Sequence, residues 1–304
     1  MIGVALHALP DGANDARRLA TQLGLPYQDI AVHRFPDGEI RVTTGTVAPT
    51  TIIYVSLDQP NDKLIALMFA AEALRRNGAK RLVLLAPYLC YMRQDTAFQQ
   101  GEAISQRAIG QLLARTVDRV ITVEAHLHRT PDIRTVFPGI EADNLSAVPA
   151  FAQALRTSGF DPSTLVVGPD AESQAWVGGL ADQLGLASAV AHKIRHSDRS
   201  VEIDFAGTVS PAGRPVLLVD DIVASGGTLI ACAGALKAAS ARTIDVIITH
   251  ALYPPEMAAA FAAAGIRSIR SSFSVPHPTN DIRLDDILAT APEREISGTA
   301  FQET

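Results

Sequence analysis

The chain has 304 residues, of which 47% are hydrophobic and 19% charged, and its formal net charge at pH 7 is −6. This length suggests two domains, and the composition is too apolar for a disordered chain. The acidic balance argues against a nucleic-acid partner, while local basic groups and helix N-termini still permit binding of a phosphorylated small molecule. No apolar run reaches the ~20 residues that span a membrane, and the N-terminus lacks a signal-peptide pattern. We therefore expect a cytoplasmic protein with no membrane partner.

Short apolar runs alternate with amphipathic stretches from one end of the chain to the other. The expected strands, in chain order, are residues 3–6, 51–55, 81–85, 119–123, 165–167, 216–219 and 243–248. The expected helices between them include residues 62–76, 105–115, 171–184 and 229–240. Continuous apolar strands separated by helices are typical of parallel sheets that helices cover on both faces. The series runs twice, with a break near residues 137–139, which predicts an α/β protein with two domains.

The most informative segment is PVLLVDDIVASGGTLIA at residues 215–231. An apolar strand ends in two carboxylates, Asp220 and Asp221, and a loop of small residues then leads into a helix that Thr228 opens. Ligands of parallel sheets bind beyond the carboxyl ends of the strands, and the N–H groups of such a loop form a cradle for a phosphate. The paired carboxylates suit sugar hydroxyl groups or a magnesium ion held by them. The alternative, an ordinary turn between a strand and a helix, leaves the acid pair and the Gly-Gly-Thr run as coincidences.

This segment resembles the ribose-5-phosphate-binding loop of the phosphoribosyltransferase and phosphoribosyl-pyrophosphate (PRPP) synthase superfamily. No GxxxxGK[ST] or GxGxxG motif is present in the sequence, so another element must hold any nucleotide. Six further segments distinguish members of the superfamily. They are HRFPDGEIRV at 33–42, PYLCYMRQDTAFQQGEAIS at 87–105, TVEAH at 122–126, EADNLSAVP at 141–149, VVGPD at 166–170 and HKIR at 192–195. In this order and at this spacing they resemble the motifs of the ribose-phosphate diphosphokinases (PRPP synthases) over nearly the whole chain.

The resemblance implies transfer of the β,γ-diphosphoryl group of ATP to the 1-hydroxyl of ribose 5-phosphate, giving PRPP and AMP. It assigns the ATP site to Phe35, Asp37, Glu39, Arg93, Gln94 and Asp95, completed by a neighbouring subunit of a homo-oligomer. It assigns Mg²⁺ to His126 and Asp170, and catalysis to Lys193 and Arg195. It assigns the ribose-5-phosphate site to Arg195, Asp220, Asp221, Ala224, Ser225, Gly226, Gly227 and Thr228. It also implies two type I phosphoribosyltransferase-like domains, 1–143 joined by a C-terminal helix at 285–304, and 144–284.

Most of these residues have simpler explanations when taken singly. An isolated Arg93 is more often part of a surface ion pair, and the PDG run at 36–38 is good turn chemistry. Magnesium prefers oxygen ligands, so His126 is assigned to the metal only through the resemblance. Lys193 and Arg195 are two residues apart, so in an extended segment they share a face. There they would stabilise the negative charge of a phosphoryl group in transfer.

The chain departs from the family pattern at three places. Ala224 stands where many PRPP synthases have an acid, so one acceptor for a sugar hydroxyl is missing. Glu-Ser at 172–173 replaces a Gly-Gly pair, and Trp176 replaces a later Arg. Glu-Ala at 124–125 replaces an Asp-Leu pair. With these differences the chain resembles the shorter, divergent PRPP synthases that lack allosteric control.

Two other functions stay open on the sequence alone. A non-catalytic homologue that binds nucleotide or sugar phosphate and regulates a partner is favoured only by the Glu-Ser change at 172–173. A phosphoribosyltransferase that uses PRPP and a base is disfavoured, because it needs neither the RFPDGE nor the RQD segment. Formation of AMP that requires both ATP and ribose 5-phosphate distinguishes the diphosphokinase from both.

Overall fold

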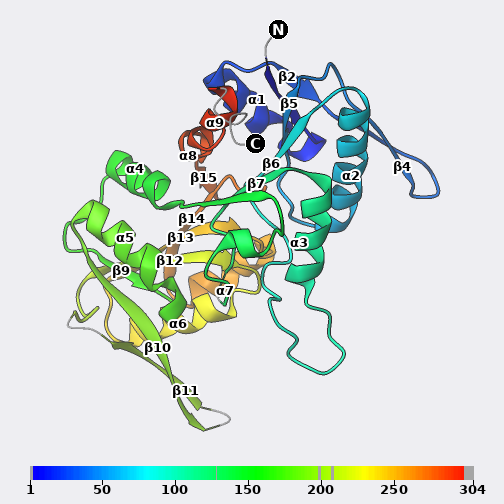
Figure 1. Cartoon of the computed structure of the whole chain (residues 1–304). Coiled ribbons are helices and arrows are strands. Elements are labelled where there is room, and N and C mark those ends of the chain that lie inside the picture. The colour runs from blue at the N-terminus through cyan, green and yellow to red at the C-terminus, as the bar shows by residue number, and fades with distance from the viewer. Residues whose placement is uncertain (1–2, 128, 198–199, 207–208, 298–304) are drawn as a thin grey trace. The chain divides into compact units, whose positions relative to one another are not determined.

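The structure is a computed structural model that describes residues 3–127, 129–197, 200–206 and 209–297. Within it, the side chains of residues 192–197 and 200–206 lie outside the described part. The chain divides into two compact units (Figure 1). The first runs to Leu145 and takes in the chain again from Asp285, and the second is Ser146–Leu284.

The first unit contains a six-stranded parallel sheet in the order β2-β1-β5-β6-β7-β8. Its strands are β1 (Val4–Ala8), β2 (Tyr27–Asp29), β5 (Thr50–Tyr54), β6 (Arg81–Ala86), β7 (Arg119–Val123) and β8 (Glu141–Leu145). Every residue of β1, β5 and β7 is buried. This pattern is expected of parallel strands whose two faces are both covered.

The helices of the first unit are α1 (Ala13–Leu23), α2 (Pro60–Arg76), α3 (Ser105–Thr116), α8 (Asp285–Thr290) and α9 (Glu293–Ile296). Two short 3₁₀ turns, η1 (Pro10–Gly12) and η2 (Ile133–Thr135), complete it. A separate antiparallel hairpin of β3 (Ala31–Arg34) and β4 (Ile40–Thr43) packs against α2. The tip of that hairpin is the PDG turn expected from the sequence.

The second unit has a seven-stranded sheet in the order β11-β10-β9-β12-β13-β14-β15. Its strands are β9 (Leu165–Gly168), β10 (Ala187–Ser197), β11 (Ser200–Ala206), β12 (Pro215–Val223), β13 (Thr243–Ala251), β14 (Ile266–Ser272) and β15 (Asn280–Ile282). All neighbours are parallel except β10 and β11, which form an antiparallel pair. The predicted fold class, mainly parallel sheets flanked by helices, is thus confirmed.

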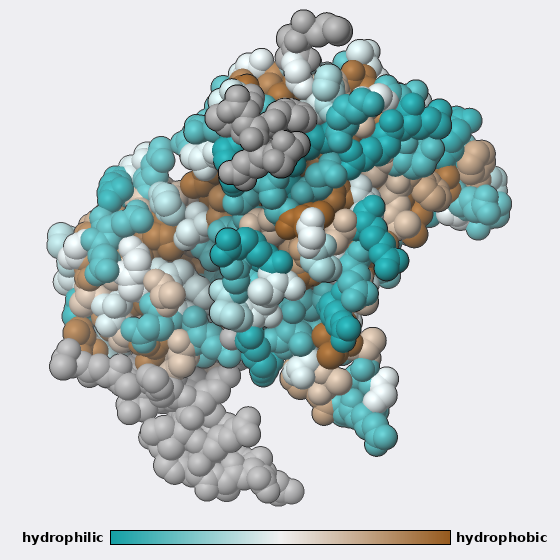
Figure 2. Space-filling model, viewed as in Figure 1, coloured by the Kyte–Doolittle hydropathy of each residue, from teal (hydrophilic) through white to brown (hydrophobic). Residues whose placement is uncertain are grey.

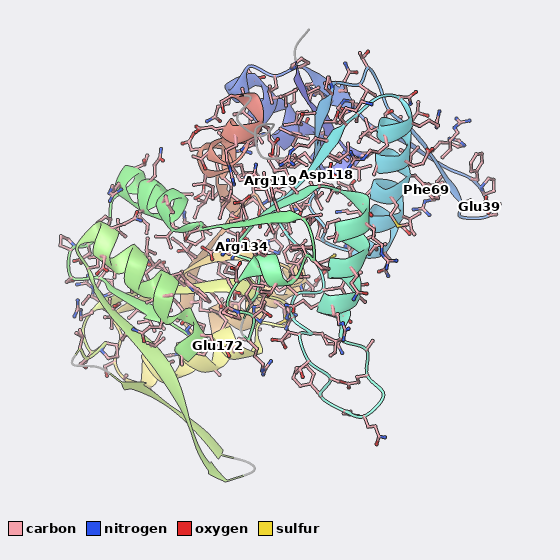
Figure 3. The ribbon with its side chains drawn as sticks, in the orientation of Figure 1. Glu39, Phe69, Asp118, Arg119, Arg134 and Glu172 are labelled. Atoms are coloured by element: carbon pink, nitrogen blue, oxygen red, sulfur yellow. The ribbon has the colours of Figure 1, made fainter. Side chains whose placement is uncertain are left out.

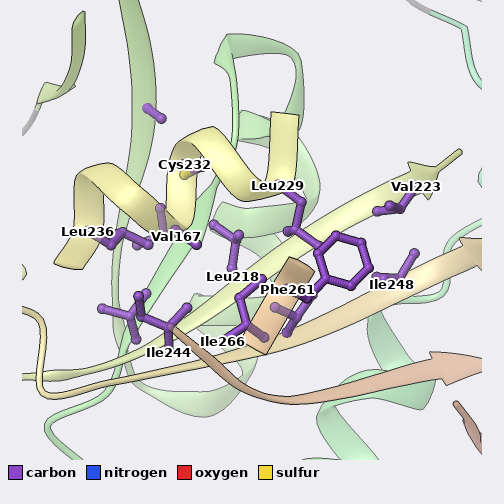
Figure 4. Packing of buried hydrophobic residues seen from close by; sticks show 14 of the residues in the cluster. Val167, Leu218, Val223, Leu229, Cys232, Leu236, Ile244, Ile248, Phe261 and Ile266 are labelled. Atoms are coloured by element: carbon purple, nitrogen blue, oxygen red, sulfur yellow. The ribbon is translucent and has the colours of Figure 1, made fainter. Parts of the chain in front are cut away.

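Helices pack on this second sheet. They are α4 (Val148–Ser158), α5 (Gln174–Leu184), α6 (Gly227–Ala238) and α7 (Ala258–Ala263), with 3₁₀ turns η3 (Ala171–Ser173) and η4 (Pro255–Met257). Figure 4 shows the main core, in which Leu229, Cys232 and Leu236 of α6 lie over strand residues such as Leu218. Phe261 of α7 belongs to the same buried cluster.

Two segments differ from their expected form. Residues 141–145, which the sequence places at a break between domains, form β8 and pair in parallel with β7. The HKIR segment at 192–195 is not among the expected strands, yet its backbone lies within β10 and pairs with β11. The polar residues at 141–145 hide this strand from a search for apolar runs, because backbone pairing with β7 rather than burial of both faces holds it in the sheet. No helix in the described part of the chain is long and apolar enough to cross a membrane.

Candidate active site

The carboxyl ends of β9 and β12 form the centre of the candidate site in the second unit. The chain leaves β9 for one side of the sheet, toward β10, and later returns on the other side as β12. Such a reversal of strand order leaves a crevice where ligands bind. Val167 of β9 is the register partner of Leu218 of β12. Asp170 and Asp220 follow these two partners closely, so both carboxylates lie at the same edge of the sheet.

Negative charge accumulates at this edge. Burial raises the pKa of Asp220 well above its ordinary value, and the charges of Asp221 and Asp170 raise it further. The Asp221 N–H donates to Asp220 Oδ1 at 3.0 Å, and the Ile222 N–H donates to Asp221 Oδ1 at 2.7 Å. These bonds fix the two carboxylates, whose other lone pairs can accept from sugar hydroxyl groups or bind a cation. Binding of such a ligand would reduce the electrostatic repulsion between these carboxylates.

The loop at 224–228 begins where β12 ends and leads directly into α6. Gly226 has φ +76° and directly precedes the first residue of α6. The backbone N–H groups of the first turn of a helix have no carbonyl partner inside that helix. A Cβ on Gly226 would lie 2.6 Å from Cε1 and Cζ of Phe261, so the aromatic ring and the backbone conformation both require glycine. The loop thereby presents a row of N–H groups at the positive end of a twelve-residue helix, as an anion site needs.

The Glu-Ser change at 172–173 affects the turn after β9 in two different ways. Ser173 is fully buried, and its hydroxyl donates to the carbonyl oxygen of Asp170 at 2.5 Å while its N–H lies 3.3 Å from Asp170 Oδ1. Ser173 therefore helps to fix the backbone at Asp170. Glu172 is exposed on η3, and Figure 3 labels it. Trp176 lies half-buried in α5, and its buried indole N–H has no hydrogen-bond partner among the described residues.

The residues of the hairpin that are predicted to bind ATP lie on one turn. The Phe35 N–H donates to the Glu39 carbonyl at 2.8 Å, and the Gly38 N–H donates to the Phe35 carbonyl at 3.0 Å. Asp37 Oδ1 accepts from the Glu39 N–H at 3.1 Å. All are exposed, and Figure 3 shows Glu39 at the tip of the hairpin. The structure thus brings Phe35, Asp37 and Glu39 together on an accessible turn.

The predicted residues 93–95 follow β6 and are held to different degrees. Arg93 is exposed, while the Gln94 side-chain oxygen accepts from the Ser105 hydroxyl at 2.7 Å. The Asp95 side chain is only 5% exposed, and its Oδ1 accepts from Arg129 Nη1 at 2.9 Å. Sequence reasoning missed Arg129, since no motif marks it. The Asp95 carboxylate is thus engaged in an ion pair, whereas Arg93 is accessible.

The remaining predicted residues lie on separate elements. His126 is half-buried just after β7, next to Ala125, whose N–H donates to Asn144 Oδ1 of β8 at 2.8 Å. Sequence reasoning gave Asn144 no role, although it lies within a recognised motif. Lys193 and Arg195 occupy β10, opposite Ile203 and Val201 of β11. Their side chains lie outside the described part of the structure.

No three or more His, Cys, Asp or Glu side chains come together as a metal-ligand set within the described part of the chain. Magnesium sites do not require such a set, because Mg²⁺ is usually bound through one or two carboxylates together with substrate phosphates and water. Asp170, which follows β9, supplies a carboxylate of this kind at the edge where Asp220 and Asp221 also lie. The donors present therefore fit a magnesium ion that arrives with a phosphorylated substrate.

Comparison with known proteins gives matches over nearly all of the chain. A family model described as the N-terminal domain of ribose phosphate pyrophosphokinase matches residues 7–116, and one described as a phosphoribosyl transferase domain matches residues 144–263. A ribose-phosphate pyrophosphokinase of Methanopyrus kandleri is 31% identical over 293 residues, covering 96% of this chain and 99% of the relative. One from Bradyrhizobium diazoefficiens is 32% identical over 295 residues, covering 95% and 90%.

A solved structure shows the same fold. The crystal structure of phosphoribosylpyrophosphate synthetase from Mycobacterium smegmatis superimposes with a TM-score of 0.83 at 23% identity, covering 97% of this chain and 99% of that one. The family expected from the sequence motifs is therefore confirmed. The chain belongs to the ribose-phosphate pyrophosphokinase (PRPP synthase) family.

Proposed function

We propose that this chain is an active ribose-phosphate diphosphokinase, which transfers the β,γ-diphosphoryl group of ATP to the 1-hydroxyl of ribose 5-phosphate and yields PRPP and AMP. The observation that carries this proposal is the edge formed by β9 and β12. There a fixed pair of carboxylates adjoins a loop of N–H groups at a helix N-terminus. This combination suits a sugar phosphate, since the loop matches the phosphate and the carboxylates match the hydroxyl groups.

Ribose 5-phosphate would bind with its phosphate at residues 224–228. The backbone N–H groups of Ser225, Gly226, Gly227 and Thr228 would donate to the phosphate oxygens, and Ala224 adds no side-chain acceptor. Asp220 and Asp221 would accept from the ring hydroxyl groups. The bonds that fix these two carboxylates would hold the sugar in one orientation.

ATP would bind through residues of the first unit. Phe35 offers an exposed ring for stacking on the base, and Asp37 and Glu39 offer acceptors on the same turn. Arg93 is the accessible cation of the 93–95 segment, and Gln94 is oriented by Ser105. Asp95 would complete this part of the ATP site, and its ion pair with Arg129 holds its carboxylate in place.

Magnesium would enter with ATP, with Asp170 and His126 at the positions that the resemblance assigns. When bound, Mg²⁺ neutralises charge on the phosphate oxygens and orients the diphosphate chain. The raised pKa of Asp220 shows how strongly this edge favours a cation or a hydrogen-bond donor. Ser173 contributes by fixing the backbone of Asp170.

Lys193 and Arg195 would stabilise the transferred group during reaction. In-line transfer spreads negative charge over the phosphoryl oxygens, so catalysis consists of positioning and electrostatic stabilisation rather than a protein nucleophile. A compact ammonium and a planar guanidinium two positions apart on β10 suit that task. Loss of one such donor costs on the order of 10²–10³ in rate.

A second copy of the chain would complete the nucleotide site. The turn that carries Phe35, Asp37 and Glu39 is exposed, and Ile65 and Phe69 of the adjacent α2 are 45% and 46% exposed. Figure 2 shows tan and brown surface over this part of the first unit. An exposed apolar patch beside exposed ligand residues favours a homo-oligomer in which one subunit presents its hairpin to its neighbour.

Phosphorus NMR of the purified protein with ATP, Mg²⁺ and ribose 5-phosphate tests the activity. We expect AMP and PRPP to grow in equal amounts and only when the sugar is present. Lys193→Ala should lower the rate by about 10²–10³, whereas Lys237→Ala, an exposed lysine at the end of α6, should leave it unchanged. Binding of ATP or ribose 5-phosphate without AMP would instead support the regulatory homologue. Release of ADP would contradict the diphosphoryl transfer.

A further inference from the structure

A cavity of about 420 Å³ lies in the second unit at the amino ends of the sheet strands. Its wall includes Pro215 and Thr243, the first residues of β12 and β13. The loop at 224–228 follows the last residue of β12, so the cavity and the candidate ribose-5-phosphate site lie at opposite ends of the same strands. The catalytic proposal above assigns this cavity no role.

The floor and one wall of the cavity are apolar. Leu217 of β12 and Ile247 of β13 face away from the core cluster that contains their neighbours Leu218 and Ile248. Leu155 of α4 and Phe160 of the turn after it also line the space, together with Leu186. Phe160 is partly exposed, so one aromatic ring is available for contact with a ligand. This volume and lining are typical of sites for small organic molecules.

Three arginines, Arg242, Arg267 and Arg270, border the same space. Arg267 Nε donates to Asp245 Oδ1 at 2.9 Å, and Arg242 Nη2 donates to Asp161.

Arg270 Nε donates to Asp281, and its Nη1 donates to the Ser158 hydroxyl at 3.2 Å. The hydrogen bonds described for Arg242, Arg267 and Arg270 use one or two of the five N–H donors on each side chain. Their acidic partners thus orient the guanidinium groups and leave donors for a further anion.

The attraction of this cavity for an anion rests on the spare guanidinium N–H donors rather than on a positive net charge. Asp161 and Asp245 line the cavity, and Asp281 pairs with the third arginine beside it, so the three arginines have three acidic partners and the cluster carries no net charge. The Ser163 hydroxyl and backbone N–H, together with Arg242, hold the pKa of Asp161 near 2, so the acidic partner of Arg242 is ionised at neutral pH. Guanidinium groups match phosphate oxygens in geometry, and a phosphate offers three terminal oxygens to the spare N–H donors where a carboxylate offers two.

We propose that this cavity is a second ligand site, which binds a phosphate ester with a flat aromatic body. The aromatic part would lie on the apolar floor against Phe160, and the phosphate would meet Arg242 and Arg267 at the rim. The site would be occupied independently of ribose 5-phosphate, and it does not depend on the chain being a diphosphokinase.

Methyl NMR of the full chain locates the binding directly. 1-Naphthyl phosphate is the probe, and an excess of ribose 5-phosphate occupies the loop at 224–228. We expect shifts of the Leu155, Leu217 and Ile247 methyl signals without shifts at Val223 and Leu229 beside that loop. No shift of the cavity methyls at millimolar probe, or shifts only near the loop, would overturn the proposal.

Single substitutions test separately how the cavity recognises the phosphate and the aromatic ring of the proposed ligand. Arg267→Gln and Phe160→Ala should each weaken 1-naphthyl phosphate at least about tenfold, because each removes one half of the recognition. The control Arg156→Gln removes an exposed arginine of α4 that hydrogen-bonds to the Gln183 carbonyl and does not line the cavity, so affinity should stay within twofold.

Two comparisons keep the test decisive. Inorganic phosphate should bind at least tenfold more weakly than 1-naphthyl phosphate. Equal affinities would show that the cavity binds anions without recognising an aromatic ring, and this would refute the proposed ligand class. Ribose 5-phosphate shifts at Leu229 should be the same in Arg267→Gln as in the parent, which shows that the variant is folded. Unchanged probe affinity in that folded variant would refute the role of the arginines.

Discussion

Arg119 of β7 and Glu295 of α9 form an ion pair across 176 positions of the chain, with 3.0 Å between Arg119 Nη1 and Glu295 Oε1. Each side chain is 1% exposed. Arg81 of β6 binds the other carboxylate oxygen, Glu295 Oε2, at 2.7 Å. One buried acid thus ties the C-terminal helix of the first unit to two of its strands, one of which leads into the TVEAH segment.

Removal of Glu295 should destabilise the first unit strongly. Glu295→Ala leaves two arginines, one of them fully buried, without their shared acid, and loss of one partner of a buried ion pair typically costs about 3–5 kcal/mol. Urea unfolding followed by circular dichroism measures the loss. Glu293→Ala, an exposed position on the same short helix, should change the free energy of unfolding by less than about 0.5 kcal/mol. Equal effects of the two substitutions would show that the ion pair contributes nothing specific.

The same acid should make unfolding sensitive to low pH. Burial raises the pKa of Glu295, but the hydrogen bonds and charges of Arg81 and Arg119 outweigh it, so the pKa lies below its ordinary value of 4.5. A group of this kind contributes stability above its unfolded pKa, and the contribution is lost as the pH falls below about 4.5. The stability difference between Glu295→Ala and the parent should therefore shrink from pH 6 to pH 3.

His7 should make the first unit lose stability on mild acidification. His7 is fully buried in β1, and burial lowers its pKa from 6.5 to about 4, although an interaction with the Thr46 backbone opposes part of this shift. The unfolded chain then binds a proton between pH 6.5 and 4 that the folded chain does not, so stability falls in that window by up to about 3 kcal/mol.

Replacement of this histidine isolates its effect. His7→Leu keeps an apolar side chain of similar size and removes the titrating group, so the fall in unfolding free energy between pH 7 and pH 5 should be smaller than in the parent. His33→Leu, on the exposed hairpin strand β3, serves as the matched control and should not alter the pH profile. A parent profile that is flat across this window would contradict the role given to His7.

Gly226 should tolerate no side chain. Gly226→Ala puts a residue with a Cβ at φ +76° and 2.6 Å from the Phe261 ring, so we expect a loss of about 1–3 kcal/mol and at least a tenfold weaker binding of ribose 5-phosphate. Calorimetry measures both. Gly234→Ala, in the same helix with open space around it, should instead stabilise by about 0.5–1 kcal/mol. Unchanged sugar-phosphate affinity in Gly226→Ala would contradict the proposed phosphate cradle.

The Asp220 carboxylate should lower the unfolding free energy of the ligand-free protein and strengthen the binding of ribose 5-phosphate. Because burial and two nearby carboxylates raise its pKa, the folded state holds a proton more tightly than the unfolded state, and stability falls as the pH rises above about 4. Asp220→Asn should therefore raise the unfolding free energy of the ligand-free protein at pH 7 by about 1 kcal/mol. The same change should weaken ribose 5-phosphate.

The control for this trade-off is Asp182→Asn, an exposed acid on α5. It should alter neither stability nor sugar-phosphate affinity. Thermal unfolding with and without ribose 5-phosphate compares the variants. A less stable ligand-free Asp220→Asn would show that this carboxylate stabilises the fold rather than serving the ligand.

The sequence alone determined those features whose physical cause is local. Runs of apolar, largely β-branched residues predicted the buried strands of both units, because such strands bury both faces and need no particular partner to be recognised. The acid pair at 220–221 and the loop at 224–228 could also be predicted from the sequence, because their cause is local too. The strand, the cradle and the helix start follow one another directly along the chain.

Tertiary structure alone decided the relationships that depend on distant partners. The polar segment that forms β8 joins the sheet because Arg119 of the neighbouring strand is paired with Asp143, and nothing in its own pattern predicts burial. The ion pair between Asp95 and Arg129, 34 positions away, could not be predicted from the sequence. The charge of an isolated side chain does not reveal which opposite charge the fold brings within reach. Pairing across the sheet therefore had to be seen in the folded chain.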